Sequence, residues 1–226
     1  MRLKFIFGGS DKPIETPLQD FVNSMIHRML GKDNKYHDNF SNYSLTGLMG
    51  GKYVGGKFYF NDGAHFYVSS TDEDFIKLIF ESFSQNDELM MGHMKLLDVS
   101  FDDFEVQRDY DIVRTISPIL LKDKGRTITF EDDDFIDILT RKSRQKLIHN
   151  GFTEKEAETL VLTPFHFENA KHTYVKVGKA VNKASSVMIV VRGDKKVRYA
   201  MYNMGFGKST GCGFGSITII RKDYKK

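Results

Sequence analysis

The spacing of hydrophobic residues in the first half of the chain changes several times, and each change marks the boundary of a predicted element. Residues 2–8 alternate between apolar and polar side chains, which is typical of a strand with one buried face. From Leu18 to Leu30 the apolar residues recur every three or four positions, which predicts a helix that ends at Gly31. Short strands are predicted near residues 43–49, 57–60 and 65–69, a second helix at 75–83 and a bent strand at 94–106.

The second half repeats this order of elements in outline. Strands are predicted at residues 112–121 and 127–130, helices from 132 to 149 and after 153, strands near 174–178 and 187–192, a short helix at 195–203 and a last strand at 217–220. Thr153 and Glu156 have the spacing of a capping box. The order βα, ββ, αβ is that of the ferredoxin-like fold. The sequence therefore predicts an α+β protein of two tandem ferredoxin-like (RRM-like) βαββαβ domains, residues 1–108 and 109–226.

Composition excludes several classes of protein. The chain has 226 residues, of which 40% are hydrophobic, so a sizeable core is available. No apolar run approaches the roughly 18 residues that a membrane helix needs, and the first residues do not read as a secretory signal. The single cysteine, Cys212, excludes an internal disulfide and a thiolate metal site. We therefore expect a cytoplasmic protein with no metal, no cofactor and no contact with a membrane.

The net charge of +3 conceals an asymmetry along the chain. From Lys171 onward there are thirteen Lys or Arg and two Asp, which gives +11 and leaves −8 for the preceding part. A strongly basic C-terminal quarter is an electrostatic footprint for nucleic acid. The alternative is a solvated basic tail, and this applies to the last lysines. Lys195 and Arg198 fall within structured-looking segments, so we predict that they contact phosphates.

A doublet of Gly-aromatic-Gly units lies near the C-terminus: residues 205–207 and 213–215 read GFG and are separated by five residues. Glycine is tolerated where the backbone needs positive φ or where another chain comes close. Backbone N–H groups in such a loop form concavities that bind anions, so we predict a phosphate-binding loop; a mobile surface hairpin is the alternative. The residues assigned to this contact are Gly205, Gly207, Lys208, Ser209, Thr210, Gly211, Gly213 and Gly215.

Two other phosphate-binding motifs do not fit this loop. The nucleotide-triphosphate motif needs a glycine where Tyr202 stands, and it needs a helix after Lys208-Ser209 rather than more glycines and a strand. The dinucleotide fingerprint needs a glycine where Thr210 stands. The loop therefore predicts neither a triphosphate nor a dinucleotide site.

The glycine doublet resembles the glycine-rich loop of the repeat-associated RNA-processing proteins of CRISPR systems. Within that superfamily the chain looks most like the Cas-six endoribonucleases, which cut the long precursor transcript inside each repeat. Residues 1–7, 18–44 and 113–119 are similar to the family's first strand, to its first helix with the following loop, and to the strand that opens its second domain. The resemblance implies metal-independent attack by a 2′-hydroxyl, giving a 2′,3′-cyclic phosphate and a 5′-hydroxyl. It also implies CRISPR repeat RNA as the partner of a monomer or homodimer, with other CRISPR effector-complex proteins as further candidate partners.

Histidine suits the proton transfers of such a reaction because its pKa lies near neutrality. The resemblance assigns the catalytic histidine to His37, in the polar loop after the first helix, and His27 on that helix is the second candidate. Where several family members carry a tyrosine on the helix, this chain has Asn23, so Tyr36 or Tyr43 is the candidate substitute. Lys52 or Lys35 is the candidate for the family's lysine. The five other histidines have no comparable context: His65, His93, His149, His166 and His172.

Two further interpretations remain open at this point. A non-catalytic member of the same superfamily would bind guide RNA within an effector complex without cutting it. A ferredoxin-like enzyme or ligand sensor unrelated to RNA is the third interpretation, and the basic C-terminal quarter argues against it.

Overall fold

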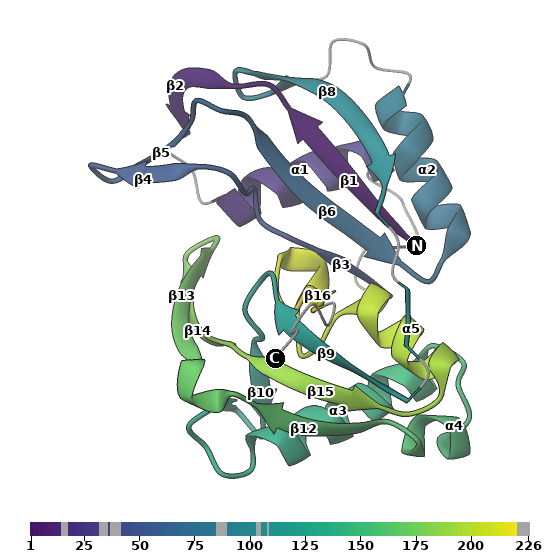
Figure 1. The fold of residues 1–226 in the computed structure, drawn as a ribbon. Helices are drawn as coiled ribbons and strands as arrows, with labels where there is room; N and C mark the ends of the chain where they lie inside the picture. The colour runs from purple at the N-terminus through teal and green to yellow at the C-terminus, as the bar shows by residue number, and fades with distance from the viewer. Residues whose placement is uncertain are drawn as a thin grey trace, which may run out of the picture.

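The computed structural model describes residues 1–14, 18–31, 36, 42–84, 90–102, 105–107 and 109–220. Two units, each built on one main sheet, lie one above the other, with the N-terminal unit at the top of Figure 1. No helix in the described ranges is long and apolar enough to cross a membrane.

The N-terminal unit has the βαββαβ order of elements that its sequence pattern predicts. Its main sheet has the strand order β3-β6-β1-β8-β7, and each pair of neighbours is antiparallel. The elements of this unit are β1 (Arg2–Phe7), α1 (Leu18–Leu30), β3 (Tyr43–Leu45), β6 (Ala64–Ser70), α2 (Glu73–Ser84), β7 (Met90–Met91) and β8 (Met94–Phe101). A second, small sheet has the order β2-β5-β4 and consists of β2 (Ser10–Ile14), β4 (Lys52–Val54) and β5 (Lys57–Phe60).

The core of this unit follows from two hydrophobic patterns in its sequence, alternation in the strands and a repeat of three to four residues in the helices. Alternation in β1 buries Leu3, Phe5 and Phe7 on one face of the sheet. The ring of Phe5 stacks on Phe66 of the neighbouring strand, with 4.8 Å between the ring centroids. The apolar stripe of α1 adds the buried residues Val22, Met25, Ile26 and Leu30 to the same cluster. The helix predicted at residues 18–30 is thus confirmed with the same bounds.

The C-terminal unit repeats the topology. Its four-stranded sheet has the order β12-β15-β9-β16, which matches the order β3-β6-β1-β8 of the first unit. Its elements are β9 (Tyr110–Thr115), α3 (Phe135–His149), α4 (Glu154–Glu158), β12 (Val161–Phe165), β15 (Met188–Arg192), α5 (Lys195–Met204) and β16 (Ile217–Ile219). Two hairpins are inserted, β10 (Leu121–Asp123) with β11 (Arg126–Ile128) and β13 (Lys171–Val177) with β14 (Ala180–Ser186). Short 3₁₀ turns lie at Phe167–Asn169 and Thr210–Cys212.

The predicted α+β fold of two tandem ferredoxin-like units is confirmed, and so is the capping box at Thr153 and Glu156. Some strand predictions were wrong in detail. Residues 112–121 are not one strand, because β9 ends at Thr115 and the chain bends at Ile116-Ser117. The strand β12 was not predicted; it contains Pro164, which an edge strand tolerates. Residue 108, the predicted domain boundary, lies outside the described residues.

Hydrogen bonds join the two units at several points. The buried side chain of Arg2 in β1 donates to the carbonyl oxygen of Ile217 in β16 at 2.8 Å. Ser44 Oγ in β3 donates to the carbonyl oxygen of Asn203 in α5 at 3.1 Å. The tip of the β13–β14 hairpin reaches the upper unit in Figure 1, where the backbone N–H of Gly178 donates to the carboxylate of Asp20 at 2.9 and 3.1 Å. These bonds fix the units relative to each other.

Candidate functional site

A cleft of about 1050 Å³ lies where the two units meet. The N-terminal unit contributes side chains of α1 and of the segment that leads into β3. The C-terminal unit contributes α3, the β10–β11 hairpin and the glycine loop, residues 205–215. The lining residues are His27, Tyr36, Tyr43, Leu121, Lys122, Lys124, Gly125, Lys142, Gln145, Lys146, His149, Gly207, Lys208, Ser209, Thr210, Gly211 and Cys212.

The two Gly-aromatic-Gly units determine how the loop packs. Gly207 and Gly215 have φ of +79° and +64°, a conformation that favours glycine. A Cβ on Gly215 would lie 1.8 Å from the carbonyl oxygen of Phe206, and one on Gly207 would lie 2.6 Å from that of Leu120. Phe206 and Phe214 are buried and anchor the loop in two hydrophobic clusters. The doublet is therefore required for the packing of the loop itself.

The loop also packs closely on the N-terminal unit. A Cβ on Gly213 would lie 2.9 Å from the side chain of Gln19 in α1. The hydroxyl of Thr210 donates to the carbonyl oxygen of Tyr43 at 2.9 Å. Glycine is needed here because another part of the chain comes close, which is the second of the two reasons that the sequence suggested.

Only part of the predicted phosphate-binding loop faces the cleft. Gly205, Gly213 and Gly215 are buried and do not line it, so for these three the predicted contact with RNA does not fit the structure. Gly207 and Ser209 are partly exposed there, and their backbone N–H groups have no hydrogen-bond acceptor among the described residues. Lys208 is exposed and Thr210 and Gly211 are buried, although all three line the cleft. The donors left for an anion are thus on the segment from Gly207 to Ser209.

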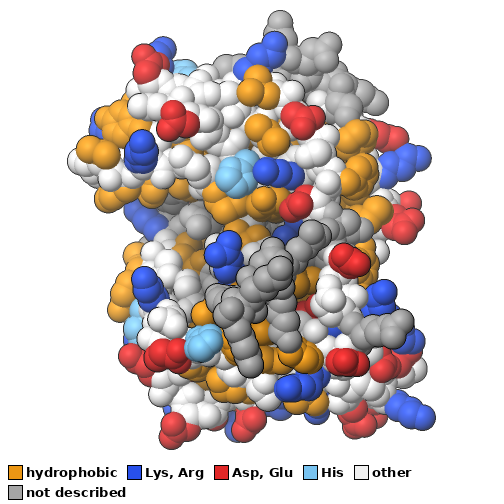
Figure 2. Space-filling model, viewed as in Figure 1, with side chains coloured by type: hydrophobic (Ala, Val, Ile, Leu, Met, Phe, Trp, Pro, Cys, Tyr) orange, Lys and Arg blue, Asp and Glu red, His pale blue; other side chains and the backbone are white. Residues whose placement is uncertain are grey.

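The charge of the cleft is positive, because five lysines and no aspartate or glutamate belong to its lining residues. Among the described residues, Lys142 is the lining lysine that lies against a carboxylate, that of Asp123 at 3.2 Å. On the face of the molecule drawn in Figure 2, Lys and Arg side chains are likewise present in both units. Four of the lining lysines precede Lys171, in the part of the chain whose net charge is −8. Folding therefore gathers positive charge that a count along the sequence does not reveal.

Lys146 differs from the other lysines of the cleft because its side chain is only 7% exposed. Its ammonium group donates to the carbonyl oxygen of Met204 at 2.6 Å, to that of Gly205 at 3.3 Å and to the hydroxyl of Thr210 at 2.9 Å. Burial lowers the pKa of Lys146 to about 7, because desolvation disfavours the charged form. Sequence reasoning missed this residue.

Two histidines line the cleft from different units, His27 from α1 and His149 from α3. His27 was a predicted candidate, whereas His149 was given no functional context. The available signal was the spacing of Lys142, Lys146 and His149, four and then three residues apart, which puts polar side chains on one face of a helix.

The other catalytic candidates differ in their positions, and one of them lies outside the described residues. His37 lies outside the described residues, while its neighbour in sequence, Tyr36, lines the cleft and packs edge-on against Phe75. Tyr43 lines the cleft with 4% of its surface exposed, and burial raises its pKa to about 12. Lys52 lies on β4 outside the cleft lining, with a side chain that is 80% exposed and 3.9 Å from Asp62.

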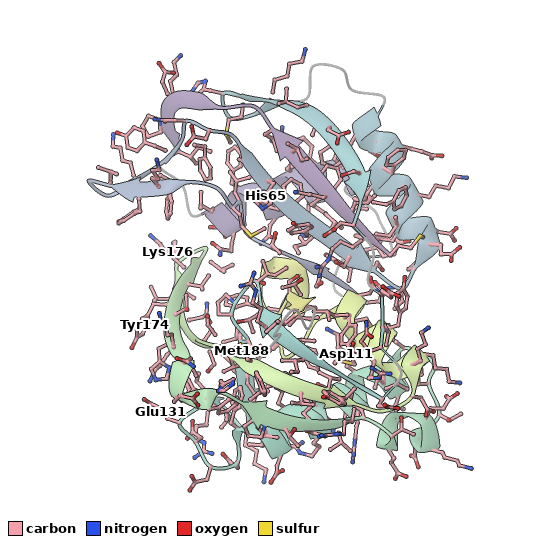
Figure 3. All side chains as sticks on the ribbon, in the orientation of Figure 1. His65, Asp111, Glu131, Tyr174, Lys176 and Met188 are labelled. Atoms are coloured by element: carbon pink, nitrogen blue, oxygen red, sulfur yellow. The ribbon has the colours of Figure 1, made fainter. Side chains whose placement is uncertain are left out.

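The two cations predicted on the last helix have separate positions. Lys195 is exposed at the start of α5 and does not line the cleft. Arg198 is fully buried: it forms an ion pair with Asp111 and donates to the carbonyl oxygens of Gln107 and Gly193. Asp111 lies beside α5 in Figure 3. The guanidinium group of Arg198 is bonded within the core of the unit, so its position gives no support to the predicted contact with RNA.

Comparison with known proteins identifies the family. The family model described as CRISPR associated protein Cas6, C-terminal, matches residues 101–219, more than half of the chain. The chain belongs to the Cas6 family, in agreement with the resemblance of its glycine loop.

Individual relatives support this assignment. The chain is 27% identical to the CRISPR-associated endoribonuclease-like protein Cas6nc of Pyrococcus horikoshii over 176 residues, 71% of this chain and 70% of that protein. A structure described as that of a Cas6-related gene product from Pyrococcus furiosus superposes with a TM-score of 0.82 at 19% identity, covering 98% of this chain and 99% of that one. A RAMP protein described as binding different RNA substrates has a TM-score of 0.81 at 21% identity, covering 97% and 99%. The structural matches show that the fold is shared.

Proposed function

We propose that this protein is an endoribonuclease that cleaves CRISPR precursor RNA within the repeats. The observation that carries the proposal is the cleft: it is lined by an imidazole from α1, by a loop with available amides and by a set of lysines. Relatives named as endoribonuclease-like, and a solved relative described as binding RNA, support the substrate class.

The proposed reaction needs few groups. The RNA supplies its own nucleophile, a 2′-hydroxyl, which attacks the adjacent phosphorus and expels the 5′ oxygen. The 2′-hydroxyl loses a proton and the 5′ oxygen gains one; His27 or His37 serves one of these transfers and water serves the other. The amides of Gly207 and Ser209, together with the ammonium of Lys208, stabilise the negative charge that develops on the phosphorane. The products are a 2′,3′-cyclic phosphate and a 5′-hydroxyl, and no metal takes part.

A cleavage assay tests this proposal. The purified protein is incubated in EDTA with end-labelled RNA that contains one CRISPR repeat, and both product ends are identified. We expect cleavage that is lost in His37→Ala or in His27→Ala, with RNA affinity retained in each. His166→Ala is the matched control, because His166 is exposed, lies 2.7 Å from Glu168 and does not line the cleft. Cleavage only after addition of a divalent cation would contradict the mechanism.

A second candidate function is that of a non-catalytic member of the family that holds guide RNA. Two positions favour it: Tyr43 lines the cleft but is only 4% exposed, and Lys52 does not line the cleft. This function predicts tight binding of repeat RNA and no cleavage under any of the conditions above.

A further inference from the structure

The side chain of Lys146 uses all of its hydrogen-bonding capacity within the protein. A lysine ammonium has three N–H donors, and the three acceptors within reach are the carbonyl oxygens of Met204 and Gly205 and the hydroxyl of Thr210. The first acceptor belongs to the last residue of α5, the second to the first residue of the glycine loop and the third to the middle of the loop. Lys146 therefore holds two parts of the loop together and has no donor left for a phosphate.

Thr210 continues this connection into the other unit. Its hydroxyl accepts from Lys146 and donates to the carbonyl oxygen of Tyr43, the first residue of β3, at 2.9 Å. The ring of Tyr43 stacks on Phe75 of α2, with 4.6 Å between the centroids. A continuous series of contacts thus runs from α3 through the glycine loop to the wall of the N-terminal unit. Because Thr210 is only 1% exposed, its hydroxyl serves this connection and not the RNA contact predicted from the sequence.

We propose that Lys146 and Thr210 are positioning residues that hold the glycine loop at a fixed place relative to the wall that carries His27. This inference rests on the proposed function, in which groups from both units act on one phosphate. A shift of about 1 Å between such groups costs on the order of 100-fold in rate. The two side chains lie behind the surface that the RNA would touch, so they act through the loop.

The kinetic test compares four variants of the full-length chain. Thr210→Val removes the hydroxyl and keeps the shape, whereas Thr210→Ser keeps the hydroxyl. Lys146→Met removes all three donors, and Lys142→Met removes a cleft lysine that does not bond the loop. We expect kcat to fall about 10-fold in Thr210→Val, the effect of one lost hydrogen bond, and about 100-fold in Lys146→Met. KM should change less than about threefold in both, and Thr210→Ser should restore kcat.

Hydrogen exchange separates this inference from the proposed function. We expect faster exchange in peptides that cover residues 205–215 and 43–45 for Lys146→Met and Thr210→Val, but wild-type exchange there for Thr210→Ser and Lys142→Met. This result would support the positioning role even if the wild-type protein bound RNA without cutting it, in which case the proposed function alone would fail.

Three results would overturn the inference. The first is equal exchange in Thr210→Val and Thr210→Ser. The second is faster loop exchange without any fall in kcat in a protein that cleaves. The third is a rise in KM with unchanged kcat for Lys146→Met, because that pattern belongs to a residue that binds the substrate directly.

Discussion

Gly211 lies directly against the ring of Tyr43: a Cβ added to Gly211 would be 2.8 Å from both Cζ and the hydroxyl oxygen of that ring. This contact joins the glycine loop of one unit to the first residue of β3 in the other. Both partners line the cleft. The width of the cleft at this point is therefore set by the absence of a side chain at position 211.

Substitution of Gly211 by alanine should separate the two units locally. The new methyl group must displace a ring that is 4% exposed, and overpacking of this kind costs about 1 to 3 kcal/mol. We expect a lower free energy of unfolding in urea and weaker binding of repeat RNA. Gly8→Ala is the matched control, because a Cβ there makes only ordinary contacts of 3.7 Å or more with Leu97. Equal unfolding curves for the two variants would disprove the proposed constraint.

Replacement of Arg198 should affect stability and not RNA recognition. In Arg198→Met the carboxylate of Asp111 loses its buried partner, and breaking such a pair costs about 3 to 5 kcal/mol. We expect a lower thermal midpoint, and an RNA affinity equal to that of the wild type at temperatures where the variant is folded. Lys195→Ala, which removes an exposed charge from the same helix, should leave the midpoint unchanged. A folded Arg198→Met protein with weakened RNA binding would contradict this assignment.

The stability of the protein should depend on the protonation of Lys146. Its pKa is near the usual 10.5 when the chain is unfolded and about 7 when it is folded. Between these values the unfolded chain binds more protons, so the free energy of unfolding should rise as the pH increases from 7 to 9. Below pH 7 both states are protonated and the cost of burying the charge is fully present. Urea unfolding at several pH values measures this slope.

Lys146→Met provides the control for this pH dependence. The variant lacks the titrating group, so its free energy of unfolding should vary less between pH 7 and 9. The range stays below the pKa of Tyr43, which burial raises to about 12 and whose ionisation would act in the opposite direction above pH 10. An identical slope in the wild type and the variant would rule out Lys146 as its source.

The exposed lysines of the cleft should determine the salt dependence of RNA binding. Each lysine that neutralises a phosphate releases counterions, so Lys124→Ala or Lys208→Ala should lower the slope of log Kd against log salt concentration by about 1. Lys77→Ala on α2 is the control, because Lys77 lies 3.9 Å from Glu81 and does not line the cleft. Unchanged slopes in both cleft variants would show that the RNA lies elsewhere.

The fold could be predicted wherever one period dominates a segment. The apolar stripe of α1 and the alternation of β1 each define a buried face, so their positions follow from the sequence. The strand β14 could not be predicted in this way, because its central residues Asn182 and Lys183 are polar. Its conformation comes from hydrogen bonds with β13, in which Asn182 is paired with Val175 and Lys183 with Tyr174.

The sequence predicts where the glycine loop of the candidate site lies along the chain, but not which side chains line the cleft. The glycine doublet located the loop, yet the sequence does not show which glycines are needed for packing and which face the cleft. The lysines on α3 and on the β10–β11 hairpin precede the loop by at least 59 positions, in the part of the chain whose net charge is −8. The spacing of Lys142, Lys146 and His149 puts them on one face of a helix, but only the folded structure shows that this face lines the same cleft as His27.

The contact between Arg2 and Ile217 has a consequence for biosynthesis. A ribosome makes β1 more than two hundred residues before β16, so the guanidinium of Arg2 cannot bond its acceptor in the C-terminal unit until β16 has been synthesised. Until then Arg2 can bond only within its own unit, where it donates to Ser69 Oγ, and the rest of its guanidinium group stays hydrated. Docking of the two units therefore follows the synthesis of β16.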